Sequence, residues 1–114
     1  MPFIHSKNNI KTTANQHQEL KSPLGEAISI LPGKSEAWLM INLEDDQKMY
    51  FRGDDSEPLA FICVNCYGNA DEAAFDRMTA ELTKIYGEVL GIKADHMYIK
   101  YDASLHWGWN GSNF

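Results

Sequence analysis

The residue with the clearest chemical potential is Pro2, which directly follows Met1. A residue as small as proline lets an aminopeptidase remove Met1, and the chain would then begin with a secondary amine. The pKa of an ordinary α-amino group is about 8, and burial or a nearby cation lowers that pKa. Such an amine is a candidate general base near neutral pH. The alternative is that Met-Pro is a common start without chemical meaning.

Two lysines are candidates to act beside such a base. Lys34 follows a predicted helix end, where a solvated lysine would merely complement the helix dipole. Lys100 lies on a predicted strand between Tyr98 and Tyr101, and is either an edge residue or directed into a cleft.

Cys63 and Cys66 have the Cys-x-x-Cys spacing. Residues three apart in a strand point to opposite faces, so these thiols can neither bridge each other nor hold one metal ion. The four histidines are scattered and show no ligand spacing. We therefore expect neither a metal nor a cofactor.

The composition is typical of a globular domain, and we expect residues 1–114 to form a single one. Hydrophobic residues make up 44% of the chain and charged residues 23%. The net charge of −6, without a basic stripe, disfavours nucleic acid as a partner. No apolar run approaches the roughly 20 residues of a membrane helix, and no signal peptide is visible. The expected location is cytoplasmic.

The first half of the chain predicts a strand, a helix and a hairpin. Residues 2–6 suit a strand and residues 7–13 a loop. Apolar residues spaced by three and four predict a helix over residues 16–31, whose regular part begins near Ser22 with Pro23 in its first turn. Residues 38–43 and 48–51 are predicted to form the two strands of a hairpin.

The second half repeats the strand and helix order. Residues 59–67 are almost continuously apolar, which is typical of a strand buried on both faces. Asn69 or Asp71 caps a second helix that ends at Gly91, and residues 97–101 form a further strand.

Strand, helix and strand thus occur twice, at similar spacing, which indicates a duplicated α/β fold. We predict a four-stranded mixed sheet with two helices on one face. Because two helices cover only one face, the other face, with its many apolar positions, needs a partner subunit.

Short motifs along the whole chain resemble the macrophage migration inhibitory factor family of the tautomerase superfamily. They are Met1-Pro2, Gly33-Lys34, Met49-Tyr50-Phe51 followed by Ser56-Glu57-Pro58, Tyr98-Ile99, and Gly108-Trp109-Asn110-Gly111-Ser112 with a closing Phe114. The resemblance implies a homotrimer, with each active site between two subunits and the N-terminal proline as base.

The resemblance also implies roles for individual residues. Pro2 abstracts a proton from the carbon next to a ketone, and Lys34 binds the substrate's oxygens and lowers the pKa of the proline. The backbone amide of Tyr67 contacts the substrate carboxylate, and Tyr98 comes from the neighbouring subunit to face the ketone end. Three further aromatic residues wall the pocket: Trp38, Trp109 and Phe114.

Several positions depart from the family pattern, including Ser35 in place of a proline and Leu59 and Ile62 in place of a cysteine pair. Lys100 replaces the usual asparagine, Tyr67 replaces a smaller aliphatic residue, and Arg52 replaces the first glycine of a Gly-Gly pair. We expect the base to be kept while the pocket changes in shape and charge. In particular, Lys100 is predicted to bind substrate as a second cation.

Two classes of function follow from the resemblance. The leading interpretation is an isomerase of the phenylpyruvate or dopachrome tautomerase type, acting on a small aromatic keto acid or its enol. It requires removal of Met1, since Pro2 is otherwise an amide without a basic lone pair. The alternative is a cytokine-like or non-catalytic member that binds a cell-surface receptor after export without a signal peptide.

Overall fold

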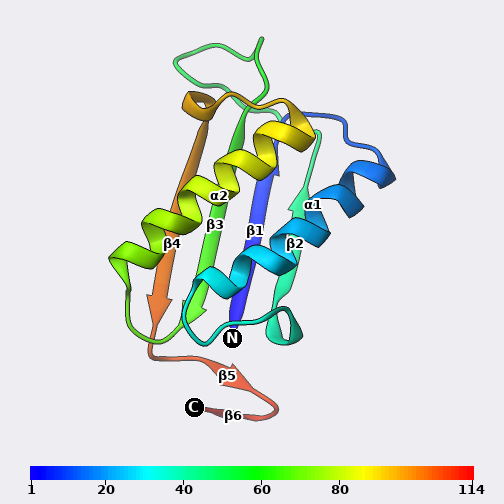
Figure 1. Ribbon diagram of the computed structural model, residues 1–114. Coiled ribbons are helices and arrows are strands. Elements are labelled where there is room, and N and C mark those ends of the chain that lie inside the picture. The colour runs from blue at the N-terminus through cyan, green and yellow to red at the C-terminus, as the bar shows by residue number, and fades with distance from the viewer.

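Four strands and two helices form the body of the fold in a computed structural model that describes residues 1–114 (Figure 1). The sheet has the order β2-β1-β3-β4. The outer strands β2 and β4 run parallel to their neighbours β1 and β3, and β1 is antiparallel to β3. The predicted mixed sheet is therefore confirmed. Its strands are β1 (Pro2–Asn8), β2 (Met40–Glu44), β3 (Ala60–Tyr67) and β4 (Met97–Ser104).

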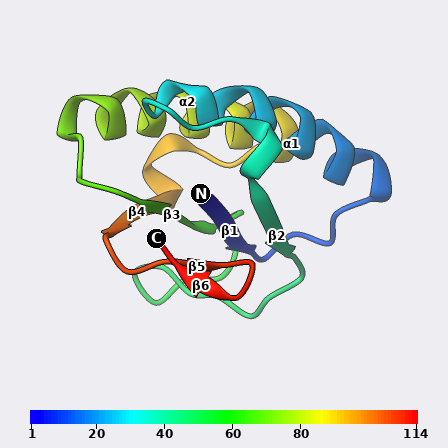
Figure 2. The ribbon, with the colours of Figure 1, turned by 90° about the horizontal axis from the view of Figure 1, so that it is seen from below.

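Both helices cover the same face of the sheet, and a small hairpin lies on the other side (Figure 2). The helices are α1 (Ala14–Ala27) and α2 (Glu72–Leu90), and the hairpin consists of β5 (Gly108–Trp109) and β6 (Ser112–Asn113). Three single helical turns connect the larger elements: Ile28–Ile30, Glu36–Trp38 and Ala94–His96. Neither helix has the length and apolar character needed to cross a lipid bilayer.

The two strand–helix–strand units pair their strands with the same spacing. Phe3 pairs with Met40 and Ala60 with Met97, so partners lie 37 positions apart in both units. Alternate residues of β1 and β3 are buried beneath the helices, where they join one apolar core. The duplication predicted from the sequence is thus visible in the strand register.

The first helix begins at Ala14, so the predicted start near Ser22 was wrong. Thr13 and Gln16 form a capping box, in which each side chain accepts a hydrogen bond from the other residue's backbone N–H. Pro23 remains inside the helix, although it has no N–H to donate to the preceding turn. The cap and the buried face carrying Leu20 and Leu24 outweigh that lost hydrogen bond.

The hairpin predicted over residues 38–43 and 48–51 does not form. Trp38 ends a helical turn, β2 pairs with β1 instead, and residues 48–51 contain only an isolated bridge from Phe51 to Asp54. The backbone N–H groups of Asp46 and Gln47 donate to the carbonyls of Ile10 and Asn8. These bonds attach the chain to the end of β1, so it cannot turn back along β2.

The second helix and the strand before it agree with the prediction, whereas β4 continues to Ser104, three residues beyond its predicted end. Asp71 caps α2 by accepting a hydrogen bond from the N–H of Ala74 at 3.0 Å. Gly91 ends the helix with a φ of 68°, a left-handed conformation that glycine adopts without strain. At the start of the chain, β1 continues to Asn8, two residues beyond the predicted end of that strand.

A buried tyrosine supplies a pH test of this packing. Tyr86 is fully buried and donates a hydrogen bond to Ser6 Oγ at 2.7 Å. Burial raises the pKa of Tyr86 from 10.0 to about 12. Since the unfolded phenol ionises first, this tyrosine loses its stabilising contribution as the pH rises from 10 to 12, by roughly 2–3 kcal/mol.

We therefore expect the free energy of unfolding of wild type to fall more steeply above pH 10 than that of Tyr86→Phe. Denaturant titrations of both proteins between pH 8 and 11.5 measure the difference in slope. Parallel curves would contradict the burial of the phenol in the folded state.

Candidate functional site

The start of β1 and the end of β3 bring three predicted site residues together. Pro2 is paired with Cys66 in the sheet, and the N–H of Tyr67 donates to the carbonyl oxygen of Met1 at 3.0 Å. Lys34 Nζ donates to the carbonyl oxygen of Tyr67 at 2.6 Å. The N-terminal amine, the Lys34 ammonium and the Tyr67 backbone therefore surround one small region at the end of the sheet.

A tight turn after the first helix positions Lys34. The N–H of Lys34 donates to the carbonyl of Leu31 at 3.1 Å, and Gly33 has a φ of 76°. A side chain would strain the backbone at that φ. The Gly33-Lys34 pair thus directs the lysine from the helix layer toward the end of β3.

The surroundings of the N-terminus favour a neutral amine. Burial lowers the pKa of the Met1 amine below its usual value of 8.0, and the positive charge of Lys34 lowers it further. Cys66 acts weakly in the opposite direction. Pro2 itself is fully buried. The end of β1 is consequently a place where an amine is held partly desolvated beside a cation.

The aromatic side chains that the resemblance assigns to the pocket wall form two ring contacts. Trp38 and Trp109 meet edge to face with ring centroids 5.2 Å apart, and Tyr67 lies 5.1 Å from Phe114. About half of the surface is exposed to solvent in each of Trp38, Trp109 and Phe114. Figure 1 shows the β5–β6 hairpin, which carries Trp109, at the same end of the sheet as the N-terminus.

Tyr98 and Lys100 lie elsewhere in the chain. Tyr98 pairs with Phe61, six residues before Tyr67 on β3, which corresponds to about 20 Å along a strand. Its ring packs edge to face against Phe51 at 5.5 Å. Lys100 Nζ lies 3.2 Å from an Asp102 carboxylate oxygen. Within one chain, therefore, Tyr98 lies too far from Pro2 to act together with it. Lys100 pairs with Cys63, which faces the opposite side of the sheet from Cys66 and Pro2.

The sequence analysis missed Cys66 as a neighbour of the site. Cys66 is buried, and burial raises the pKa of its thiol. Together with Lys34 and Phe75 it lines a cavity of about 280 Å³ behind the end of β3. The antiparallel pairing of β1 with β3 is the signal that would have placed it beside Pro2. Cys63, also a free thiol, points to the opposite face.

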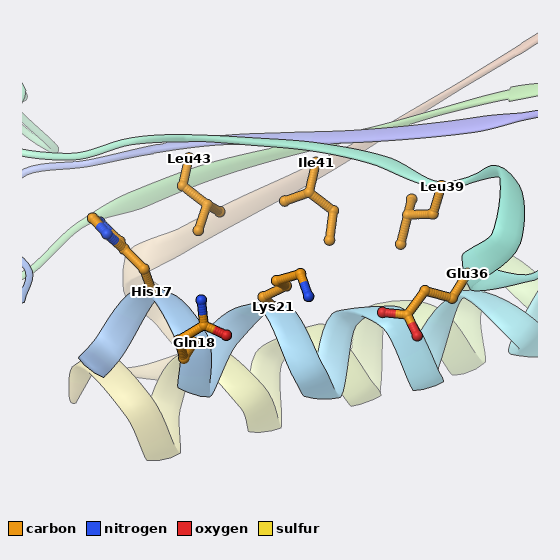
Figure 3. Close-up of a pocket in the computed structure, with 7 residues that line it drawn as sticks. All are labelled: His17, Gln18, Lys21, Glu36, Leu39, Ile41 and Leu43. Atoms are coloured by element: carbon orange, nitrogen blue, oxygen red, sulfur yellow. The ribbon is translucent and has the colours of Figure 1, made fainter. Parts of the chain in front are cut away.

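The largest cavity, of about 610 Å³, lies between α1 and β2 and contains none of the predicted site residues. Figure 3 shows Leu39, Ile41 and Leu43 pointing toward α1, from which His17 and Lys21 project. His17 is held there by Asp45, whose Oδ2 lies 3.3 Å from His17 Nε2. No group of three His, Cys, Asp or Glu side chains in the molecule is placed to hold a metal ion.

Comparison with protein-family models gives a match over residues 1–114 to the model described as macrophage migration inhibitory factor (MIF). The chain belongs to the macrophage migration inhibitory factor family. A search of curated proteins found no match. The resemblance drawn from the sequence motifs is thus confirmed at the level of the family.

Solved structures of other MIF proteins have the same fold. MIF2 of Leishmania major is 26% identical with a TM-score of 0.91, covering 100% of this chain and 97% of its own. A MIF homologue of Prochlorococcus marinus is 30% identical with a TM-score of 0.81, covering 98% of each chain. A MIF-like protein of Entamoeba histolytica is 16% identical with a TM-score of 0.87, covering 99% of this chain and 98% of its own, which shows the fold alone.

The electrostatic arrangement at the N-terminus predicts a measurable pKa change. In Lys34→Met the N-terminal amine loses the nearby cation, so its pKa should rise, while burial should still hold it below the usual value. An NMR titration of the amine measures both effects. Lys84→Met, which removes an exposed charge on α2, is the matched control and should leave the amine unchanged. An unaltered amine pKa in Lys34→Met would contradict the proximity.

Proposed function

We propose that this MIF-family protein is a keto–enol tautomerase for aromatic α-keto acids such as phenylpyruvate, with Pro2 as general base once Met1 is removed. The observation that carries the proposal is the amine environment at the start of β1. There, partial burial and Lys34 together lower the pKa of an amine. A base with a pKa near the operating pH combines a large neutral fraction with useful basicity.

In the proposed reaction the Pro2 nitrogen takes a proton from the carbon next to the ketone. The electron pair of that C–H bond forms the C=C bond, and the ketone oxygen gains the negative charge of an enolate. The protonated Pro2 then returns the proton to this oxygen, which gives the enol. Lys34 stabilises the developing negative charge, because its ammonium lies at the same end of the sheet.

Removal of Met1 has a second consequence at Tyr67. The Tyr67 N–H donates to the Met1 carbonyl, so loss of Met1 frees this donor. Lys34 Nζ uses one of its three hydrogens on the Tyr67 carbonyl and keeps two. Processing thus supplies the secondary amine and a free backbone N–H for the substrate carboxylate in one step.

The remaining walls of the proposed site fit an aromatic substrate. The Phe114 ring lies beside Tyr67, and the rings of Trp38 and Trp109 contact each other. All three, Trp38, Trp109 and Phe114, are about half exposed, so a bound ring can cover apolar area there. Burial of an aromatic ring between such residues also excludes water from the base.

We assign Tyr98 and Lys100 to the site of an adjacent subunit in a homotrimer. Support comes from the distance of Tyr98 from Pro2 within one chain, from the position of Lys100 on the face opposite Pro2, and from the sheet face that no helix covers (Figure 2). In a single chain Tyr98 is 60% exposed on that face, which is a large fraction for a tyrosine unless a second subunit covers it. Lys100 is proposed to bind substrate, but its charge is partly compensated by Asp102.

The base is tested by the state of the N-terminus. Pro2→Gly should lower kcat/KM for phenylpyruvate by roughly tenfold or more, because a flexible primary amine replaces the ring amine. Wild-type preparations with different fractions of retained Met1, measured by intact mass, should show activity in proportion to the processed fraction. Full activity in protein that keeps Met1 would exclude Pro2 as the base.

The shared site is tested by mixing two variants of reduced activity. Pro2→Gly lacks the base and Tyr98→Ala lacks the neighbouring wall. If each site uses both chains, unfolding and refolding an equal mixture should produce mixed trimers in which about a quarter of the sites are intact. Light scattering checks the mass of a trimer. A monomeric mass, or no recovery of activity on mixing, would count against the shared site.

A further inference from the structure

Arg52 occupies an unusual position at the tip of a tight turn. Phe51 and Asp54 exchange two backbone hydrogen bonds of 2.9 and 3.0 Å, which closes a two-residue loop around Arg52 and Gly53. Both central residues have positive φ values, 54° and 77°. Such turns favour asparagine, aspartate and glycine. A long side chain in this backbone conformation is an outlier for which a functional reason should be sought.

The turn holds the Arg52 guanidinium against the residues that surround Tyr98. Arg52 Cζ lies 4.9 Å from the centroid of the Phe51 ring. Phe51 in turn meets the rings of Tyr98 and His96 at 5.5 and 5.8 Å. A stacked guanidinium of this kind has a restricted position, yet its N–H groups point outward from the ring and stay available.

This cation forms no salt bridge. The ion pairs of the molecule use other basic residues, which are Lys7, His17, Lys48, Lys93, His96 and Lys100. The nearby acids have other partners: Asp54 accepts hydrogen bonds from Ser56, Asp55 pairs with Lys48, and Asp95 is bound to His96. Arg52 helps to lower the pKa of the Asp95 carboxyl but forms no salt bridge with it. Arg52 is therefore the positive charge on the Tyr98 side that is not held in a salt bridge, whereas Lys100 is paired with Asp102.

A small apolar pocket lies next to this charge. Its volume is about 130 Å³, and its lining consists of apolar and aromatic side chains with His96 as the exception. The pocket is too small for a whole aromatic keto acid, but it can form one wall of a larger site completed by a second chain. A wall of this kind, with a free guanidinium at its edge, suits the far end of an aromatic substrate that carries an anionic group.

We propose that Arg52 determines the substrate class of the tautomerase by binding a second anionic group, opposite the keto-acid carboxylate. The preferred substrates would then be aromatic α-keto acids with an additional acidic group at the far end of the ring. The proposal rests on the proposed function, because the wall that carries Tyr98 must face Pro2 of an adjacent copy. Lys34 and the Tyr67 N–H hold the first carboxylate, and Arg52 holds the second.

The test compares phenylpyruvate with para-carboxyphenylpyruvate, which differs only by the second carboxylate. In Arg52→Gly the ratio of kcat/KM for the dianion to that for phenylpyruvate should fall about fivefold, mainly through KM. Glycine suits the positive φ, so the turn should be retained. Arg52→Lys keeps the charge without the planar fork and should give an intermediate ratio. Added salt should shrink the preference of wild type and leave the ratio in Arg52→Gly unchanged.

Lys84→Ala removes one exposed positive charge from α2 and is the control for net charge. It should leave the ratio of the two substrates as in wild type. If Arg52→Gly leaves kcat/KM unchanged for both substrates, or lowers it equally for both, Arg52 does not select the second anion. The inference is then wrong, while the proposed tautomerase activity still stands. If processed wild type converts neither substrate, the proposed function itself fails, and the inference fails with it.

Discussion

The antiparallel pairing of β1 with β3 is the constraint on which the rest of the structure depends. Seven residue pairs join the two strands, from Pro2 with Cys66 to Asn8 with Ala60. Alternate residues on both strands are buried beneath the helices, and a shift of one residue would turn all of them to the opposite face. The core therefore fixes where the N-terminus lies relative to Tyr67, and a site at the end of the sheet acquires its geometry from packing far from the chemistry.

Local charge opposes the overall charge at this end of the molecule. The chain carries a net charge of −6, which repels anionic ligands at long range. Lys34 reverses that sign close to the amine, and the carbonyl of Tyr67 holds its ammonium in place. The same cation lowers the pKa of the amine. One side chain, placed by a glycine turn, thus both offers a positive charge at this end of the sheet and favours the neutral form of the neighbouring amine.

Elements with strong local signals could be predicted from the sequence, and elements decided by distant partners could not. The three- and four-residue spacing of α2, its Asp71 cap and its closing Gly91 are encoded within the helix itself. The start of α1 was misjudged because Pro23 was given more weight than the capping box at Thr13 and Gln16.

The long-range contacts explain the other errors. The prediction of a hairpin after β2 was wrong because the backbone of Asp46 and Gln47 is hydrogen-bonded to the chain at the end of β1. No local sequence pattern predicts this contact. Cys66 was overlooked beside Pro2 for a similar reason, since only the register of β1 against β3 brings the two together. By contrast, Lys34 and Tyr67 were selected through the family resemblance, and the structure places them in direct contact.

The duplicated architecture places the residues of the proposed site at two ends of the sheet that one copy cannot unite. The end with Pro2 carries the amine, the Lys34 cation and a backbone donor, and the end with Tyr98 carries an aromatic wall and Arg52. The strand β3 runs between them, and a strand that is hydrogen-bonded on both sides does not bend to bring its ends together. The two ends can meet only if the first end of one copy faces the second end of another. Contacts of this head-to-tail kind close into a ring when the rotation between copies allows it. In such a ring every copy supplies one base and one wall, so the number of complete sites equals the number of chains.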